Sequence, residues 1–269
     1  MYEAFFGLKD SPFNITPDPR FVYFSRHHHE ALTALHYGVE SRRGFIQITG
    51  EIGAGKTTLC RTLLEKLEGK AHSALVFNPK LSEFEILQVI VEDFGIQPRG
   101  KKRKDYFDAL NRFLIEELKK GYNAVVIIDE AQLLSPKVLE QVRLLSNLET
   151  STQKLLQIIL AGQPELKDLL DRPDLVQLRQ RITIRYHLPE LSRDEIGNYI
   201  SHRLRVAGAD GNFFSEDALE LMYQISAGIP RIINVLADRA MLAAFTQNTR
   251  LIGPSMIECA QADVAGVHA

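Results

Sequence analysis

GEIGAGKTT, residues 50–58, fits the pattern G-x-x-x-x-G-K-[ST], with Gly50, Gly55, Lys56 and Thr57 at the fixed positions. The apolar run at 45–48 is typical of a buried strand, and the stretch after the loop has leucines at helical spacing. A strand, a glycine loop and a helix in this order predict a phosphate-binding loop. The sequence is therefore expected to bind a nucleotide.

The residue types of this loop explain how it would hold a triphosphate. Glycines let the backbone curl so that successive N–H groups point at one phosphate, and the following helix adds the partial positive charge of its N-terminus. Lys56 is expected to reach the β- and γ-phosphates, and the Thr57 hydroxyl to bind Mg²⁺. The expected nucleotide-binding residues of the loop are Gly50, Glu51, Ile52, Gly53, Ala54, Gly55, Lys56, Thr57 and Thr58.

Two adjacent acids follow a second buried strand. The run AVVII at 124–128 is typical of a central parallel strand, and Asp129 and Glu130 come directly after it. In open α/β sheets, ligands bind at the carboxyl ends of the strands. Asp129 is expected to hold Mg²⁺ together with Thr57, and Glu130 to act as general base on the water that attacks the γ-phosphate. Two acids here favour hydrolysis over mere storage of nucleotide.

Further polar side chains stand at the ends of later strands. Gln163 follows the apolar run at 155–161, where its amide can contact the attacking water or the γ-phosphate; a turn-capping role is the alternative. Arg179 and Arg181 precede a fifth strand at 182–187. They are either solvated surface arginines or a source of positive charge for the γ-phosphate of a neighbouring subunit.

The strand pattern stops after residue 190 and amphipathic helices replace it. We expect helices at 192–207, 215–226, 231–247 and 255–264, with Ser192 and Glu195 forming a capping box. Arg231 lies in the first turn of the third of these helices, where the helix dipole disfavours a cation. Such an arginine is suited to an anion, and a bound γ-phosphate is one.

The first 30 residues are rich in aromatic residues and proline. They are expected to form an extended segment that packs as a clasp on the α/β core, and some of its rings are candidates for the wall of an adenine pocket.

A compact basic run, RGKKRK at 99–104, interrupts an otherwise balanced charge pattern. Its usual meaning is a solvated loop, and the alternative is a contact with nucleic-acid phosphates or acidic lipid.

The composition indicates an ordinary globular protein. The chain has 269 residues, 45% hydrophobic and 25% charged, and a net charge of −2, which exerts no general attraction on nucleic acid. Cys60 and Cys259 are expected to be small core residues in a reducing compartment. No apolar run approaches the roughly 20 residues of a membrane span, and the N-terminus lacks the pattern of a secretory signal. A cytoplasmic location is expected.

In combination, these features resemble the AAA+ ATPases, and within them the ExeA/GspA group of type II secretion ATPases. The resemblance spans nearly the whole chain. It implies that Lys56, Thr57 and Asp129 bind phosphate and Mg²⁺, and that Glu130 is the catalytic acid. The first sensor would be Gln163, the arginine finger acting in trans Arg181 or else Arg179, and the second sensor Arg231. The stretches that carry the resemblance are Phe5–Leu8 with Pro12 and Phe13, Pro17–Arg20, GEIGAGKTT (50–58), IIDEAQ (127–132), LAGQPEL (160–166) and LRQRI (178–182).

The expected architecture is α/β, a P-loop NTPase of the AAA+ class with a five-stranded parallel sheet and a C-terminal helical lid. Residues 1–190 would form the nucleotide-binding core with its N-terminal clasp, and residues 191–269 the lid. The expected function is Mg²⁺-dependent ATP hydrolysis that drives assembly of a secretion or cell-envelope complex. The chain would form a nucleotide-dependent oligomer with itself, contact an assembly partner, and lie in the cytoplasm, alone or as the cytoplasmic portion of an inner-membrane protein. The alternatives are a DNA-binding AAA+ regulator of the transposition type and a scaffold that binds nucleotide without hydrolysis.

Overall fold

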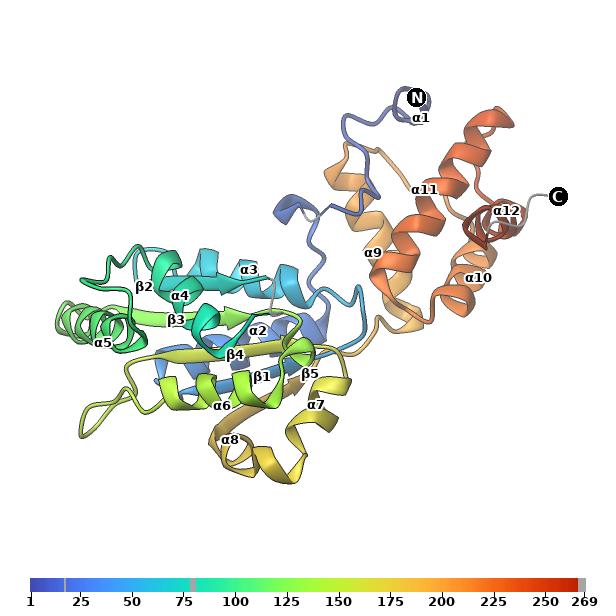
Figure 1. The fold of residues 1–269 in the computed structure, drawn as a ribbon. Coiled ribbons are helices and arrows are strands. Elements are labelled where there is room, and N and C mark those ends of the chain that lie inside the picture. Colours follow the sequence, from blue (N-terminus) through green and yellow to red (C-terminus); the bar gives the residue numbers. More distant parts are fainter. Residues whose placement is uncertain (17, 78–80, 266–269) are drawn as a thin grey trace. The chain divides into compact units, whose positions relative to one another are not determined.

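The protein folds into two compact units, described here from a computed structural model (Figure 1). The structure describes residues 1–16, 18–77 and 81–265, so Pro17 and the end of the expected lid lie outside the described residues. The first unit combines Met1–His27, Glu51–Thr58 and Pro189–Ala269, and the second combines His28–Gly50 and Leu59–Leu188.

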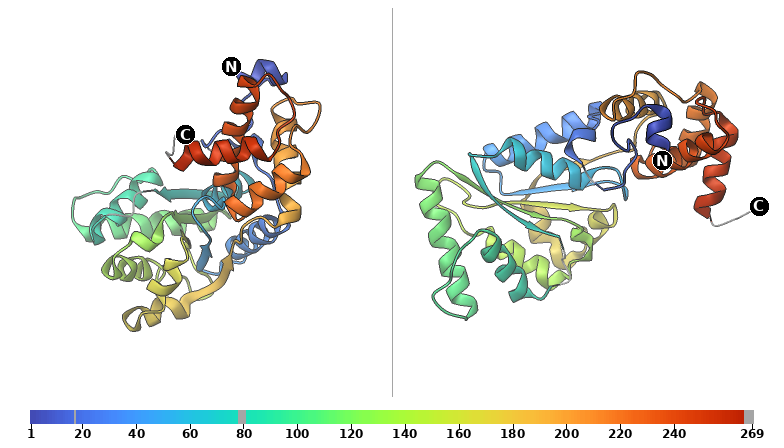
Figure 2. Two further views of the ribbon diagram at one scale, coloured as in Figure 1. Left: turned by 90° about the vertical axis from the view of Figure 1, so that its right-hand side faces the viewer. Right: turned by 90° about the horizontal axis from the view of Figure 1, so that it is seen from above.

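The second unit is built on a five-stranded parallel sheet in the order β2-β3-β4-β1-β5. The expected five-stranded parallel sheet is thus confirmed. Seen from above, the sheet lies between α2 and α3 on one side and α4, α5 and α6 on the other (Figure 2). The strands are β1 (Phe45–Thr49), β2 (Ala71–Val76), β3 (Asn123–Ile128), β4 (Gln157–Gly162) and β5 (Ile182–His187).

Both faces of β3 are covered, which explains its unbroken apolar run. Alternate residues of a strand point to opposite faces, and Val126 and Ile128 join the core formed with α4, α5 and α6 while Val125 and Ile127 are buried on the other face. The helices of this unit are α2 (Arg26–Glu40), α3 (Lys56–Lys66), α4 (Glu83–Asp93), α5 (Arg103–Lys119), α6 (Pro136–Leu145), α7 (Glu165–Leu170) and α8 (Val176–Arg181), with 3-10 turns at Ala131–Leu133 (η2) and Pro173–Leu175 (η3). The first residues of α2 (26–27) and of α3 (56–58) belong to the first unit.

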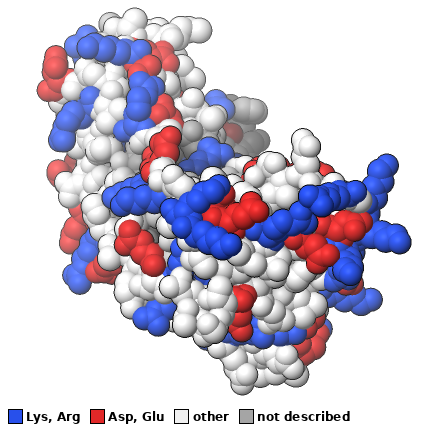
Figure 3. Space-filling view, turned by 90° about the vertical axis from the view of Figure 1, so that its left-hand side faces the viewer, with Lys and Arg blue, Asp and Glu red and all other residues white. Residues whose placement is uncertain are grey.

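The last two residues of the basic run belong to a helix. The N–H of Lys102 donates to the Asp105 carboxylate at 2.9 Å, so α5 begins at Arg103 rather than after the run. The basic residues of the run are exposed. Figure 3 looks onto the side of the molecule where α5 lies in Figure 1, and Lys and Arg side chains there are interspersed with Asp and Glu. This face is therefore of mixed charge and not uniformly basic.

The first unit is helical apart from its loops. The expected capping box is present, because the Glu195 carboxylate accepts from the N–H of Ser192 at 2.9 Å. The elements are α1 (Tyr2–Phe6), the 3-10 turn η1 (Pro19–Phe21), α9 (Arg193–Val206), α10 (Glu216–Ser226), α11 (Pro230–Thr246) and α12 (Pro254–Ala265).

The N-terminal segment is part of this helical unit. Phe6, Phe13 and Phe21 are buried in a single core with the C-terminal helices, and the Arg203 guanidinium donates to the Pro12 carbonyl at 2.6 Å. The segment therefore packs on the lid helices, and the expectation of a clasp on the α/β core is corrected. The aromatic pattern shows that these side chains need burial, but it contains no information about which distant apolar surface they bury against.

Tyr2 fixes the start of the segment to α11, which gives a test of this packing. Its hydroxyl donates to the Asp238 carboxylate, and burial, aided by this bond, raises the pKa of Tyr2 so that the phenol stays protonated. We expect Tyr2→Phe to lower the free energy of unfolding by about 1–3 kcal/mol, because a hydrogen bond to a charged group is lost. Urea denaturation measures this loss, with Tyr37→Phe on α2 as the matched exposed control; equal effects of the two variants would contradict the assignment.

Two further expectations from the sequence concern membrane spans and the two cysteines. Among the described residues, no helix has both the length and the apolar composition to cross a bilayer. Cys60 is buried as expected, whereas Cys259 is exposed on α12, so the expectation of a second core cysteine is wrong. Cys259 lies on the solvent side of an amphipathic helix whose buried positions are Met256, Ile257 and Ala260.

Candidate functional site

Polar residues of three neighbouring strands meet at the carboxyl edge of the sheet in the second unit. Gly50 follows β1, Asp129 follows β3, and Gln163 follows β4, which lies between those two strands. Because the strands are parallel, all three residues stand at the same edge. The second unit thus brings together Gly50, Asp129, Glu130 and Gln163 of the residues that the sequence selects.

Asp129 is fixed by backbone contacts on both sides. Its own N–H donates to the Val76 carbonyl at 3.0 Å, which extends the pairing of β2 with β3, and its carboxylate accepts from the N–H of Glu130 at 2.9 Å. Asp129 is buried, with 5% of its surface exposed. A buried carboxylate that its backbone contacts fix at the carboxyl edge of the sheet is suited to hold a metal ion such as Mg²⁺.

Glu130 has a left-handed backbone, with φ 52° and ψ 38°. A non-glycine residue in this region typically costs about 1 kcal/mol or more, and such residues are common at active sites. The turn directs the chain from β3 into η2. The same geometry allows the Glu130 N–H to reach the Asp129 carboxylate.

Two glutamines hold the Glu130 carboxylate. The amides of Gln132 and Gln163 donate to the same oxygen, Oε2, at 2.6 and 3.1 Å. Sequence reasoning selected Gln163 but gave Gln132 no role. The available signal was its position two residues after Glu130, where the 3-10 turn η2 lets the side chain fold back onto the acid.

The phosphate-binding loop, Glu51–Thr58, belongs to the first unit. Gly53 and Gly55 adopt φ values of 84° and 101°, a region that L-residues rarely enter, which is why these two positions carry glycine. The chain then enters α3, whose first turn contains Lys56, Thr57 and Thr58. The loop thus has the curled backbone and the helix N-terminus that an anion requires.

Two cations lie beside this loop within the first unit. Lys56 is 6% exposed, and its ammonium donates back to the Glu51 carbonyl of the loop at 2.9 Å. Arg231 packs directly on Gly53, since a Cβ added to Gly53 would lie 2.4 Å from the Arg231 Cβ. Arg231 is the second residue of α11, as the sequence predicts, and the fold brings it to the glycine loop.

Close contact between Gly228 and Leu191 fixes the chain just before Arg231, in addition to the contact between Arg231 and Gly53. Gly228, with φ 79°, leaves no room for a side chain, because an added Cβ would lie 2.0 Å from the Leu191 carbonyl oxygen. The Gly228 carbonyl in turn accepts from the Leu191 N–H at 3.0 Å. These contacts fix the start of α11.

Arg181 stands at the opposite edge of the sheet. It ends α8 immediately before Ile182, which pairs with Phe45 at the beginning of β1, whereas the loop follows Thr49 at the end of that strand. With a rise of about 3.3 Å per residue, these two edges lie roughly 13 Å apart along β1. Within the second unit, Arg181 therefore lies at the amino edge of the sheet, whereas Gly50 lies at the carboxyl edge.

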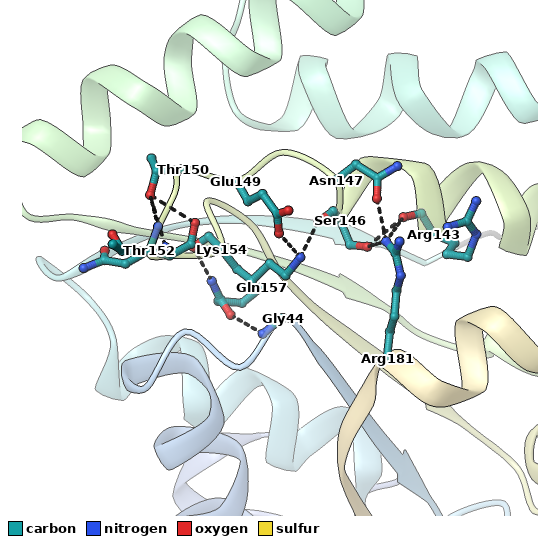
Figure 4. A network of polar contacts seen from close by, with 11 residues as sticks. Gly44, Arg143, Ser146, Asn147, Glu149, Thr150, Thr152, Lys154, Gln157 and Arg181 are labelled. Atoms are coloured by element: carbon teal, nitrogen blue, oxygen red, sulfur yellow. Dashed lines mark hydrogen bonds and ion pairs between the residues drawn. The ribbon is translucent and has the colours of Figure 1, made fainter.

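The Arg181 guanidinium is held by the end of α6 (Figure 4). Its Nη1 donates to Ser146 Oγ at 2.6 Å, Asn147 Oδ1 at 2.7 Å and the Arg143 carbonyl at 3.3 Å. All three acceptors are neutral oxygens, and within the described part of the chain Nε and Nη2 have no hydrogen-bond partner. The carboxylates of Glu140 and Glu149 interact with the guanidinium through charge alone. Arg179, by contrast, forms an ion pair with Asp171 at 3.2 Å.

A model of the AAA domain family matches residues 39–170. The general secretion pathway protein A of Aeromonas hydrophila is 45% identical over 270 residues, an alignment that covers 100% of this chain and 49% of the relative. The chain thus spans about half the length of the curated relative that it matches.

Solved structures agree in fold. Cdc6p from Pyrobaculum aerophilum gives a TM-score of 0.73 at 19% identity, covering 95% of this chain and 71% of that chain. The RuvB Holliday junction branch migration motor of Thermotoga maritima gives a TM-score of 0.59 at 18% identity, covering 90% of this chain and 69% of that chain. The α/β AAA-type P-loop fold with C-terminal helices is therefore confirmed, and at these identities the likeness concerns the fold alone.

Proposed function

Because this chain carries an AAA domain and is a homologue of general secretion pathway protein A over its full length, we propose that it is a Mg²⁺-dependent ATPase that drives assembly of a secretion or cell-envelope complex. The observation that carries the proposal is the glycine loop flanked by Lys56 and Arg231 in one unit. The Asp129–Glu130 pair at the carboxyl edge of the sheet in the other unit adds to it.

The residues present fit a bound triphosphate. The loop offers N–H groups at a helix N-terminus, and the buried ammonium of Lys56 now donates to a loop carbonyl, a partner that a phosphate oxygen would replace. The remaining loop positions, from Gly50 to Thr58, would surround the phosphates with backbone. Arg231, exposed at the start of α11 and seated on Gly53, is the proposed second sensor.

The Thr57 hydroxyl and the Asp129 carboxylate are the proposed protein ligands of Mg²⁺, which keeps several waters and bridges phosphate oxygens in sites of this kind. When bound, the ion would neutralise charge on the transferred phosphoryl group. Glu130 would take the proton of the attacking water, and Gln163 would orient that water or sense the γ-phosphate.

The proposed cellular role comes from the relative. The Aeromonas protein is named for the general secretion pathway, and the full-length match supports an equivalent role for this chain with a secretion or envelope partner. We propose that the chain acts in the cytoplasm, alone or as the cytoplasmic portion of an inner-membrane protein. Self-association would supply Arg181 to the neighbouring subunit.

A DNA-binding regulator is the competing function, and charge provides the test. The basic residues at 99–104 are exposed, but the face in Figure 3 mixes both charges and so gives no broad basic track. Binding to duplex DNA should be absent at low salt. Tight binding that weakens steeply with added salt would support the regulator instead.

Lys56→Ala tests the nucleotide site itself. We expect ATP affinity to fall by about 10- to 100-fold or more, because charge-assisted hydrogen bonds of roughly 1.5–3 kcal/mol are lost. Isothermal titration calorimetry measures the affinity, and thermal melting checks that the variant is folded. Lys66→Ala, in the last turn of the same helix and exposed, is the matched control and should bind ATP normally. Affinity of Lys56→Ala close to that of the unsubstituted protein would overturn the phosphate role.

A further inference from the structure

Gln132 links the catalytic acid to the strand that carries Gln163. Its side-chain nitrogen donates to Glu130 Oε2 at 2.6 Å, and its side-chain oxygen accepts from the backbone N–H of Gln163 at 3.1 Å. The Gln163 side chain closes the ring by donating to the same Glu130 oxygen at 3.1 Å. Both ends of the Gln132 amide are thus used, one on the acid and one on β4.

Gly162 leaves the space that this amide occupies. A Cβ added to Gly162 would lie 2.7 Å from Gln132 Oε1 and 2.9 Å from Leu166 Cδ2. Gly162 is buried and ends β4. The absence of a side chain at this position therefore allows Gln132 to lie against the strand end and reach the Gln163 N–H.

The Glu130 carboxylate gains a defined orientation from this ring. Its Oε2 accepts from both glutamine amides, so among the described residues its Oε1 is the oxygen without a hydrogen-bond donor. An acid at the left-handed start of a short 3-10 turn would otherwise sample several rotamers. Hydrogen bonds from fixed donors restrict that freedom, and catalysis depends on such restriction.

We propose that Gln132 is a positioning residue for Glu130: it holds the Glu130 carboxylate in one rotamer and couples it to the carboxyl end of β4. The proposal rests on the proposed ATPase function. Gln132 acts through Glu130 and Gln163 and has no role of its own in binding the nucleotide.

Gln132→Met tests the proposal, since methionine keeps the length and volume of glutamine and removes both hydrogen bonds. We expect kcat for ATP to fall about 10- to 100-fold with the KM for ATP within twofold, because a misplaced catalytic group costs turnover and leaves ground-state binding intact. For Gln132→Glu, kcat should fall further than for Gln132→Met, because this substitution places a second carboxylate against Glu130. Gln97→Met, in the exposed loop before α5, is the matched control and should match the unsubstituted protein.

For Gln132→Met, a kcat within twofold of that of the unsubstituted protein would overturn the proposal, whether or not the KM for ATP rises. Gly162→Ala supplies a variant that leaves Gln132 and Glu130 chemically intact: its methyl group should displace the Gln132 amide and lower kcat in the same way. Unchanged kcat in a folded Gly162→Ala protein would also count against it.

A second readout requires no turnover. In the nucleotide-free protein, Glu130→Gln should shift the ¹H–¹⁵N signals of the Gln132 and Gln163 side-chain amides, while the Gln97 amide stays unchanged. Unshifted Gln132 and Gln163 signals would disprove the ring itself. If the unsubstituted protein showed no ATP turnover, the proposed function would fail, and these spectra would still decide whether Gln132 holds Glu130.

Discussion

Arg181→Ala is expected to lower ATP turnover about 10³- to 10⁵-fold, the range known for loss of an arginine finger, while ATP affinity stays nearly unchanged. The reason is its place at the amino edge of the sheet, opposite the edge that leads into the phosphate loop. A place at that edge suits contact with the nucleotide of a neighbouring subunit. Its side-chain acceptors, just after the end of α6, are neutral oxygens, and among the described residues no carboxylate forms an ion pair with it.

Arg179→Ala is the matched control, because Arg179 lies two residues earlier on the same helix and pairs with Asp171 at the surface. Exposed ion pairs contribute about 0–1 kcal/mol, so this variant should retain turnover and stability. If Arg179→Ala lost turnover and Arg181→Ala retained it, the two roles would be exchanged.

Mixing experiments decide whether Arg181 works in trans. Arg181→Ala subunits keep Glu130, and Glu130→Gln subunits keep Arg181, so a mixed oligomer contains sites with both groups. We expect the mixture to recover part of the turnover that each variant lacks alone. Absence of recovery in a mixture shown to co-assemble would contradict action on a neighbouring subunit.

Glu130→Gln is expected to bind ATP normally and to slow hydrolysis about 10²- to 10⁴-fold, the usual effect of losing a general base. Glutamine keeps the shape and can still accept a hydrogen bond, but it cannot take a proton from water. Single-turnover hydrolysis of labelled ATP, with binding measured separately, distinguishes these effects.

The matched control for this variant is Glu165→Gln, an exposed acid in the first turn of α7. It should hydrolyse ATP at the rate of the unsubstituted protein. Rapid hydrolysis by Glu130→Gln would mean that another group serves as base.

Local patterns predicted the sheet and much of the candidate site. The strand before Gly50 and the strand before Asp129 are read from short apolar runs, and the glycine positions from the backbone that a phosphate loop needs. Such signals depend on residues close together in the chain. They predict five parallel strands but not their order, which the structure gives as β2-β3-β4-β1-β5.

The remaining features depend on contacts between distant segments. Phe13 and Phe21 pack against helices that begin more than 160 residues later in the chain. The spacing of apolar residues within a segment gives no information about such a distant contact. Gln132 gains its importance only because Gly162 brings β4 against it. Arg181 was expected just before a strand, but its contact with Ser146 depends on where α6 ends, which is at Leu145.

The joining of the N-terminal segment to the lid helices has a consequence for synthesis on the ribosome. The first 27 residues emerge early, yet the surface that covers their aromatic rings begins at Pro189. At about 5–20 residues per second, the intervening chain takes roughly 10–30 s to translate. During that interval the aromatic rings of the N-terminal segment stay exposed to water, where they can collapse onto other apolar segments or bind chaperones. The sheet of the second unit is therefore synthesised before the helical unit can complete its own core.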